Sequence, residues 1–318
     1  MTPDAPFFAE VAAAPAGARA FWLTAGDGTR LRAVAWPGGD RGTAVVFTGR
    51  AEYAEKYGPM AAALLARGLS VVVADWRGQG LSDRDALRPR LGHVTDFRDY
   101  QHDVSAMLAL ADALELPRPR WLVAHSMGGT IALRALLERT DFAGAIMSAP
   151  MWHLQMGTAT RGLTQHMTRL ARVMGLGMRL TPGAWSEPST LAVSFEANAL
   201  TSDRETFAWM VRQITAHPEL ALAGPSIHWT YAALEEMARL YVAPLPRLPV
   251  LAFLGSEETV VSASVIRRQM DRMERGELVL CPGARHEIFM ETEATRALVW
   301  RHIDAFLARA TLDSCSIS

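Results

Sequence analysis

The sequence is short of cysteine and carries almost no net charge. Cys281 and Cys315 are the only two cysteines in 318 residues, and they lie in separate segments. This count predicts no disulfide framework and is compatible with a reducing compartment. Thirty-two Lys and Arg oppose 33 Asp and Glu, which gives a formal net charge of -1 at pH 7. Since no basic cluster stands out either, we expect no nucleic-acid partner.

A long apolar run is also missing. No stretch contains the roughly 20 apolar residues that a helix needs to span a bilayer. The first residues are rich in Ala and Pro, but they include Asp4 and Glu10 and have no basic start, so they do not resemble a secretory signal peptide. We therefore expect a cytoplasmic protein, with peripheral contact to the inner membrane left open. The oligomeric state is not predicted.

Half of the residues are hydrophobic, and the chain is long enough to bury a full core. Strand and helix patterns alternate along most of it, which predicts an α/β fold with a mostly parallel central sheet and helices on both faces. The expected strands span residues 21–25, 31–36, 44–47, 70–74, 121–123, 144–148, 250–254 and 277–281. The expected helices span residues 56–66, 97–114, 131–137, 265–273 and 295–307.

The heptapeptide AHSMGGT at residues 124–130 follows an expected strand and opens an expected helix. A strand, a sharp turn and a helix are the context of a nucleophile elbow, which presents a serine at the top of a sheet. Ala124 and Gly128 are the small residues that such a turn needs two positions to either side. We therefore predict that Ser126 is a nucleophile. The simpler alternative makes Ser126 only the N-cap of a Gly-rich helix.

A nucleophilic serine needs a base, and the base needs an orienting acid. His286 lies in a loop between the last expected strand and the last expected helix, where the base belongs when the chain order is Ser, acid, His. The acid should follow the preceding strand, where Glu257 and Glu258 both occur. We choose Glu258 because it takes the place of Asp in the common pattern Gly-Ser-x-Asp-x-Val-Val, with Glu257 as the alternative.

Attack by a serine creates a negatively charged oxygen, which needs preorganised backbone N–H donors. One expected donor is the N–H of Met127, directly after the serine. The second should come from the loop after the 44–47 strand, and we choose the N–H of Arg50. Gly49 lets this loop bend inward.

The alternation of strands and helices stops after residue 150 and resumes near residue 245. The residues between form short helical patterns broken by Gly and Pro. We therefore predict a core in two parts, residues 1–150 and 245–318, with residues 151–244 inserted as a helical cap. Ligands bind at the carboxyl ends of the strands in such sheets, which is where the insertion emerges.

Large apolar side chains occur throughout the insertion. Most of its Met and Trp residues are expected to form the core of the cap, because Met fills irregular cores well. The rest must line the cavity that the cap covers. Met151, Trp152 and Trp229 flank the two junctions with the core, so we expect these three to bind substrate.

Together these motifs resemble the α/β-hydrolases, and within them the monoacylglycerol lipase-like branch. Bacterial lysophospholipases are most similar, because they share the Gly-Arg loop, the Ala before His-Ser and the glutamate pair. The resemblance covers about residues 21–307 and includes the segments GRAE at 49–52, DWRGQGLS at 75–82, LGHV at 91–94, AHSMGG at 124–129, SAPM at 148–151, NALT at 198–201 and GARHE at 283–287.

The resemblance implies hydrolysis of carboxylic esters through an acyl-enzyme, with Ser126, Glu258 and His286 as catalytic residues and with no metal or organic cofactor. The apolar insertion favours a single-chain lipid ester as substrate, either a lysophospholipid or a monoacylglycerol. Other chemistry on the same scaffold stays an alternative: a general esterase, a thioesterase or a carbon–carbon bond hydrolase. A ligand-binding protein without catalysis is a further alternative, against which the retained Ser, His and acid argue.

Overall fold

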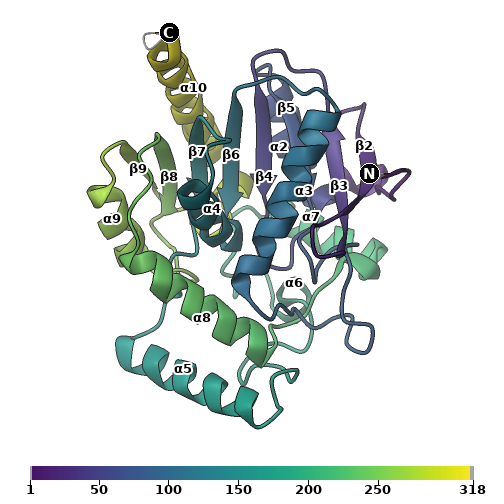
Figure 1. The fold of residues 1–318 in the computed structure, drawn as a ribbon, viewed down its shortest axis with the longest axis vertical. Helices are drawn as coiled ribbons and strands as arrows, with labels where there is room; N and C mark the ends of the chain where they lie inside the picture. Colours follow the sequence, from purple (N-terminus) through teal and green to yellow (C-terminus); the bar gives the residue numbers. More distant parts are fainter. Residues whose placement is uncertain (1, 316–318) are drawn as a thin grey trace.

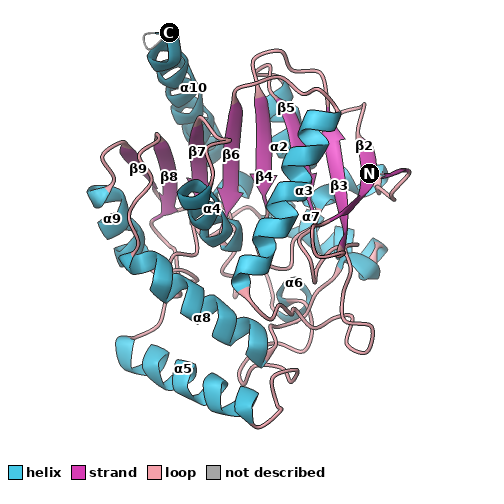
Figure 2. Ribbon diagram, in the orientation of Figure 1, coloured by secondary structure: helices cyan, strands magenta, loops and turns pink. Residues whose placement is uncertain are grey.

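A nine-stranded sheet lies at the centre of the molecule (Figures 1 and 2). The computed structural model describes residues 2–315. The strand order is β1-β2-β3-β5-β4-β6-β7-β8-β9; pairing is antiparallel from β1 to β5 and parallel from β5 to β9. The strands are β1 (Thr2–Pro3), β2 (Arg19–Thr24), β3 (Arg30–Trp36), β4 (Thr43–Phe47), β5 (Ser70–Ala74), β6 (Arg120–His125), β7 (Gly144–Ser148), β8 (Val250–Gly255) and β9 (Gly276–Cys281).

Apolar runs account for the parallel centre of the sheet. Every residue of β4, β5, β6, β7 and β8 is buried, which is typical of parallel strands covered on both faces. In Figure 1, α3 (Tyr100–Ala113) and α4 (Met127–Glu138) lie on the near face, while α2 (Gly58–Leu65) and α10 (Glu293–Cys315) lie on the far face. The predicted fold class is confirmed.

All the expected strands and helices occur, but some ends differ. The last helix runs on to Cys315 instead of ending near residue 307, because residues 308–315 contain no Gly or Pro to stop it. Two expected helices begin with a 3₁₀ turn, η1 (Ala54–Tyr57) and η2 (Phe97–Asp99). The sequence did not predict β1 or the short helix α1 (Ala9–Ala12).

Inserted helices lie beyond the end of the sheet to which the parallel strands point (Figure 2). Between β7 and β8 the chain forms α5 (Thr158–Val173), α6 (Ser189–Ala192), α7 (Arg204–Ala216), η3 (Pro218–Leu220) and α8 (Ile227–Val242). Helix α8 contacts both α4 and α5, which leaves α5 as the outermost layer. After β8 come α9 (Ala263–Arg272) and η4 (Ile288–Met290). Within residues 2–315, no helix combines the length and the apolar character that crossing a bilayer requires.

A buried ion network ties the antiparallel strands to the rest of the sheet. Arg32 of β3 donates hydrogen bonds to both carboxylate oxygens of Glu55, at 2.6 and 2.7 Å, and to Asp75 Oδ2 at 2.8 Å. None of these three side chains is exposed. Asp75 also accepts hydrogen bonds from the amides of Ala54 and Leu81. The network therefore holds the segment after β4 against the carboxyl end of β5.

Candidate active site

Ser126 occupies a strained turn between β6 and α4, with φ 49° and ψ -116°. A Cβ at position 128 would come within 2.1 Å of the carbonyl oxygen of Phe47, so only Gly128 fits there. The amide of Ser126 donates to the carbonyl of Ser148 (3.0 Å), and the amide of Met151 donates to the carbonyl of Ser126 (2.8 Å). These contacts fix the serine in the geometry of a nucleophile elbow.

A chain of hydrogen bonds joins Ser126, His286 and Glu258. His286 Nε2 lies 2.9 Å from Ser126 Oγ, and His286 Nδ1 lies 2.7 Å from Glu258 Oε2. The other carboxylate oxygen of Glu258 accepts the amides of Val260 (2.6 Å) and Val261 (3.0 Å), which fixes the acid in its loop. All three joined side chains are buried. The structure therefore brings together the three residues that the sequence singled out, from three separate loops.

The two adjacent glutamates have different surroundings. Burial raises the pKa of Glu258, but the hydrogen bond and charge of His286 outweigh it and hold that pKa below its usual value. Glu257 is exposed, and its Oε1 accepts a hydrogen bond from Ser256 Oγ at 3.1 Å. Glu258 is thus the glutamate that faces His286.

Two backbone amides near Ser126 are unengaged. Strands β4 and β6 are parallel neighbours, so the loop after β4 lies beside the elbow. Within residues 2–315, neither the amide of Arg50 nor that of Met127 donates a hydrogen bond. Both are the donors that the sequence predicted for a developing oxyanion, and their assignment to that role stays a prediction.

Gln79 holds the loop that carries Arg50. Its side-chain nitrogen donates to the carbonyls of Gly49 (2.9 Å) and Glu52 (3.1 Å), and its oxygen accepts the amide of Ala51 at 3.2 Å. Because three bonds from one side chain engage this short loop, its amides keep a defined direction.

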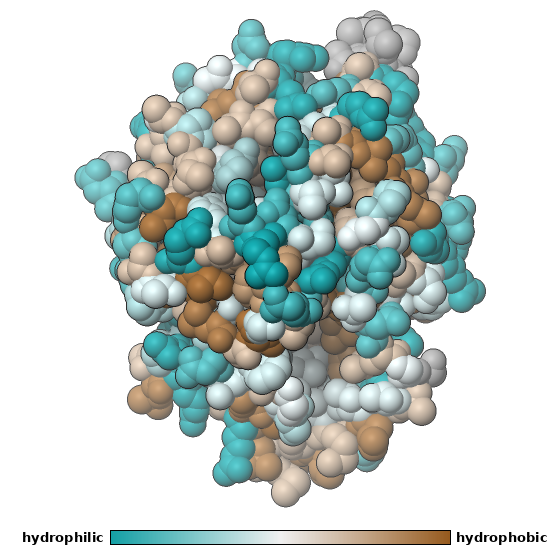
Figure 3. Space-filling model, turned by 180° about the vertical axis from the view of Figure 1, so that it is seen from behind, coloured by the Kyte–Doolittle hydropathy of each residue, from teal (hydrophilic) through white to brown (hydrophobic). Residues whose placement is uncertain are grey.

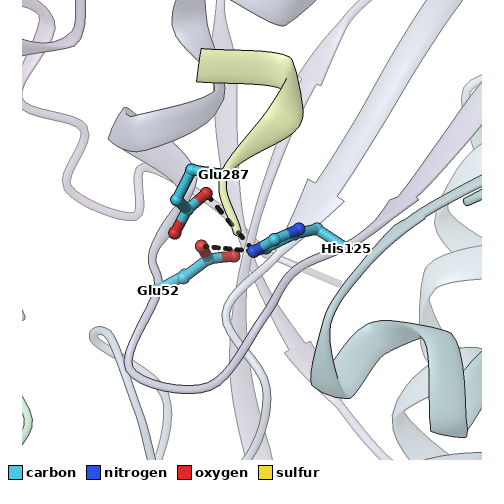
Figure 4. Close-up of side chains that lie close together, drawn as sticks. All are labelled: Glu52, His125 and Glu287. Atoms are coloured by element: carbon cyan, nitrogen blue, oxygen red, sulfur yellow. Dashed lines mark ion pairs between the residues drawn. The ribbon is translucent and has the colours of Figure 1, made fainter. Parts of the chain in front are cut away.

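Beside the elbow lies a buried polar cluster, formed by Glu52, Lys56, Tyr57, His125 and Glu287. Figure 4 shows three of its members, Glu52, His125 and Glu287. Lys56 Nζ contacts Glu52 Oε1 at 2.5 Å and Glu287 Oε1 at 2.6 Å. Tyr57 donates to Glu52 Oε2 at 2.5 Å, and His125 Nε2 lies 3.3 Å from Glu287 Oε2. Burial lowers the pKa of His125 and of Lys56, but the carboxylates of Glu287 and Glu52 outweigh burial and raise both pKa values.

In this polar cluster, the ammonium group of Lys56 occupies the role that a metal ion could otherwise fill. Glu52, His125 and Glu287 each offer one atom that could bind a metal ion, and these atoms lie within 4.8 Å of one another. The ammonium group of Lys56 already contacts both carboxylates, so the donor set is satisfied by the chain itself. With His125 and Lys56 protonated, two positive groups face two negative ones.

The polar cluster also supports the residues around Ser126. Glu52 accepts the amide of Gly49 in the loop before Arg50. His125 precedes Ser126, and its ring centroid lies 4.8 Å from that of His286. No local pattern predicts this cluster as a unit, because its members come from three distant segments. The available signal was that Glu52, His125 and Glu287 lie inside motifs of the resemblance.

Three residues expected to bind substrate are buried in the main core. The amide of Met151 contacts Ser126, the indole of Trp152 donates to the carbonyl of Gly129 (3.2 Å), and the indole of Trp229 donates to Tyr100 OH (3.3 Å). A small hollow of about 80 Å³ lies next to the polar cluster, and its lining includes Arg50, Glu52, Lys56, Leu200, Met210 and Leu222. The substrate contacts of the three expected residues stay a prediction.

Comparison with protein families identifies the architecture. The family model described as serine aminopeptidase, S33, matches residues 38–293. The chain belongs to this α/β-hydrolase family. This α/β-hydrolase also shares its fold with a monoglyceride lipase from Saccharomyces cerevisiae, with a TM-score of 0.71 and 23% identity over 91% of this chain and 94% of that one.

Curated relatives of this α/β-hydrolase are lipid ester hydrolases by name. Lysophospholipase L2 of Escherichia coli K12 is 29% identical over 281 residues, which cover 83% of this chain and 80% of its own. A probable lysophospholipase L2 of Haemophilus influenzae is 27% identical over 267 residues, covering 83% and 82%. Human monoglyceride lipase is 23% identical over 299 residues, covering 91% and 90%. This α/β-hydrolase is accordingly of the esterase and lipase kind.

Proposed function

We propose that this α/β-hydrolase cleaves carboxylic esters of single-chain lipids, lysophospholipids or monoacylglycerols, through an acyl-enzyme on Ser126. The observation that carries the proposal is the hydrogen-bonded series from Ser126 Oγ through His286 to Glu258. Two unengaged amides support it as the expected oxyanion donors, that of Arg50 in the loop after β4 and that of Met127 at the start of α4. The names of the relatives favour these two substrate classes.

The proposed reaction starts with proton transfer from the serine. A carboxylate only accepts hydrogen bonds, so the Nδ1 atom of His286 carries the proton that faces Glu258, and Nε2 is free to accept. As Ser126 Oγ attacks the ester carbon, His286 takes its proton, and Glu258 stabilises the resulting imidazolium. The amides of Arg50 and Met127 bind the negative oxygen of the tetrahedral intermediate.

Collapse of the intermediate expels the alcohol, which takes the proton back from His286, and leaves the acyl group on Ser126. Water then attacks the acyl-enzyme, with His286 as base, and releases the fatty acid and the free serine. We further propose that residues 151–244 act as a cap over this site, because α5 to α8 lie beyond the carboxyl ends of the strands.

The outer face of α5 supports a lipid substrate. The residues that α5 turns toward the protein are polar: Gln165 donates to Glu235, Arg172 donates to His228 Nδ1 at 2.9 Å, and Thr168 is buried. Its apolar residues point outward instead, with exposed fractions of 63% for Leu163, 54% for Met167, 47% for Leu170, 81% for Val173 and 64% for Met174. Figure 3 shows apolar residues among hydrophilic ones at this lower end of the molecule.

We propose that this outer face of α5, comprising the five apolar residues just named, rests on an anionic lipid surface. From residue 142 to residue 186 the sequence contains no Asp or Glu, whereas Arg161, Arg169, Arg172 and Arg179 fall in this stretch. Exposed apolar side chains beside the exposed Arg169, in a segment without carboxylates, match the chemistry of a membrane interface with anionic head groups. Substrate would then reach the cap from the surface on which it resides.

A side-by-side hydrolysis assay tests the proposed function. Lysophosphatidylethanolamine, monoacylglycerol, a diacyl phospholipid, an acyl thioester and a short acetyl ester are compared below micelle-forming concentrations, together with labelling by a fluorophosphonate. We expect the highest kcat/KM on the two single-chain lipids, and Ser126→Ala should lose both hydrolysis and labelling. Equal rates on acetyl esters would leave only a general esterase. If the fluorophosphonate did not label the wild-type protein, the alternative of a ligand-binding protein without catalysis would be favoured.

A further inference from the structure

Arg50 is expected to contribute its amide to the oxyanion, but its side chain has contacts of its own. Its Nη1 donates to the carbonyl of Ala223 at 2.9 Å, and its guanidinium lies 5.7 Å from the ring centroid of Trp229. Gly92 leaves room for it, because a Cβ at that position would lie 3.1 Å from Nη1. The guanidinium is therefore held between the loop after β4, the 91–94 segment and the start of α8.

No negative charge accompanies this guanidinium. Within the part of the chain that the structure describes, no carboxylate forms an ion pair with Arg50. The two carboxylates that line the same hollow as Arg50, those of Glu52 and Glu287, are both engaged by Lys56. Burial lowers the pKa of Arg50 to about 10, at which it stays protonated at neutral pH. Arg50 is thus a surplus positive charge at the wall of the site.

The guanidinium also has hydrogen-bonding capacity left over. It carries five N–H donors, and one of them, on Nη1, is used by Ala223. None of its nitrogens is among the fully buried polar atoms that lack a partner in the described chain, and the Arg50 side chain is only partly buried. Arg50 also lines the hollow beside the polar cluster. A cation with a planar array of free donors is suited to a phosphate group.

The position of Arg50 matches the alcohol part of a lysophospholipid. If its amide binds the oxyanion, its side chain starts next to the reacting carbon. A glycerol backbone separates the ester oxygen from the phosphate in a lysophospholipid, and an arginine side chain has a comparable reach. A monoacylglycerol has a hydroxyl at the same place and cannot neutralise the guanidinium.

We propose that the Arg50 guanidinium binds the phosphate of the head group and thereby makes lysophospholipids better substrates than monoacylglycerols. This inference rests on the proposed function and adds a choice between its two substrate classes. The phosphate displaces water from the free donors, and its charge compensates a cation that the chain leaves unpaired. The ester chemistry itself is the same for both substrates.

The test compares kcat/KM for lysophosphatidylglycerol and for monoacylglycerol with the same acyl chain, below micelle-forming concentrations, in the wild type and in Arg50→Gln. Gln removes the charge but keeps an N–H group that can donate to the carbonyl of Ala223. A purely structural role of this hydrogen bond would therefore be retained in the variant. Any loss through the oxyanion loop affects both substrates and cancels in their ratio. We expect the ratio to fall at least about tenfold, chiefly through KM, with partial rescue in Arg50→Lys.

Arg90→Gln serves as the matched control. Arg90 is exposed, and its carbonyl accepts the amide of Ala223, so it borders the same loop without an ionic role in the site. We expect its substrate ratio to equal that of the wild type. A ratio in Arg50→Gln equal to the wild-type ratio, with both esters still hydrolysed, would overturn the inference and leave the proposed function intact. If the wild type hydrolysed neither of the two esters, the proposed function itself would be rejected.

A competition arm separates the head group from free phosphate. Glycerophosphoglycerol and inorganic phosphate are each added to the monoacylglycerol reaction of the wild type and of Arg50→Gln. We expect glycerophosphoglycerol to inhibit the wild type more than the variant, and inorganic phosphate to inhibit both weakly and equally. Stronger inhibition of the wild type by inorganic phosphate than by the phosphodiester would mean a free-anion site and would contradict the head-group assignment.

Discussion

Of the six residues other than glycine with positive φ in residues 2–315, three are Ser126 itself and residues in neighbouring loops. Ala51 (φ 62°), Ser126 (φ 49°) and Ala149 (φ 42°) follow β4, β6 and β7, and the three strands lie side by side in the sheet. Such backbone is unfavourable for residues with a Cβ and persists only where the surroundings impose it. Strain is thus concentrated in the three loops that carry or face Ser126.

The first prediction separates the two adjacent glutamates. Glu258→Gln removes the negative charge that orients and stabilises His286, so we expect kcat to fall by about 10²–10⁴. Glu257→Gln changes an exposed side chain and should stay within about twofold of the wild type. Steady-state kinetics on one ester, with circular dichroism to check folding, make the comparison. A larger loss of kcat in Glu257→Gln than in Glu258→Gln would instead assign the role of the acid to Glu257.

The second prediction concerns pH and His153. Burial, together with the charge of Arg161, lowers the pKa of His153 to about 4, and its Nε2 faces Arg161 Nη1 at 3.0 Å. A neutral imidazole is therefore favoured in the folded state. Because the unfolded chain binds this proton first, the contribution of His153 to stability is present above about pH 6.5 and is lost toward about pH 4.

Urea unfolding of the wild type and of His153→Gln at about pH 7 and pH 5 measures this contribution. Gln keeps an acceptor for Arg161 but does not titrate. We expect the wild type to lose about 1 kcal/mol more than the variant on acidification, allowing for partial screening by solvent. Parallel losses in both proteins would assign the pH dependence to other groups.

Some residues of the site could be predicted from the sequence, and others could not. Ser126, Glu258 and His286 follow strands in a fixed chain order, so local patterns were enough to single them out, and the structure brings them into contact. The salt bridge between Lys56 and Glu287 joins residues 231 positions apart, and no local pattern indicates such a pair. Contacts of this kind depend on the folded sheet.

At the scale of elements, α5 shows the limit of periodicity. Its spacing of apolar residues predicts an amphipathic helix, but not which face meets the protein. Most Met and Trp residues of the insertion were expected to form the core of the cap, but Met167 and Met174 are exposed. The polar face contacts α8 instead, because Arg172, Gln165 and their partners satisfy one another there. Periodicity is the same for a buried and an exposed apolar face.

The third prediction tests the outer face of α5. Replacing Leu163, Met167 and Leu170 together by Ser removes apolar area from an exposed face, so folding should be little affected. We expect binding to phosphatidylglycerol vesicles in a sedimentation assay to fall at least about tenfold, since each buried methylene contributes about 0.8 kcal/mol. Binding of the wild type should weaken with added salt, because arginines take part.

Leu87→Ser provides the control, because Leu87 is 85% exposed and lies outside the insertion. It should bind vesicles as the wild type does. Light scattering of the same proteins without lipid examines the other occupant of an apolar face, a second copy of the chain. A dimer that the triple variant abolishes, together with unchanged vesicle binding, would reject the membrane surface.

At the scale of the whole molecule, the network around Arg32 predicts a large effect on stability. Arg32→Met leaves the buried carboxylates of Glu55 and Asp75 without their cation. We expect the free energy of unfolding to fall by about 3–5 kcal/mol, as measured by urea denaturation. Arg30→Met, on an exposed side chain in the same strand, should change it by less than about 0.5 kcal/mol. Similar losses in both variants would place the effect in the strand itself.

The sheet was the most predictable part of the whole. Its central strands are continuous apolar runs bounded by turns, and such runs are recognisable without knowledge of their neighbours. The Arg32 network was not predicted, because it joins β3 to η1 and to the loop after β5. A charged residue in a strand gives no sign of the partner that it meets inside the fold.

The order of the site residues along the chain has a consequence for synthesis on the ribosome. Ser126 and its elbow emerge early, but His286 comes only after the insertion and two further strands, and Glu291 then holds the amide of Arg285 at 2.8 Å. Proteins emerge from the N-terminus at about 5–20 residues per second. A nascent chain therefore contains Ser126 without His286 until translation is nearly finished, so the hydrogen-bonded series from Ser126 through His286 to Glu258 can form only near the end of synthesis.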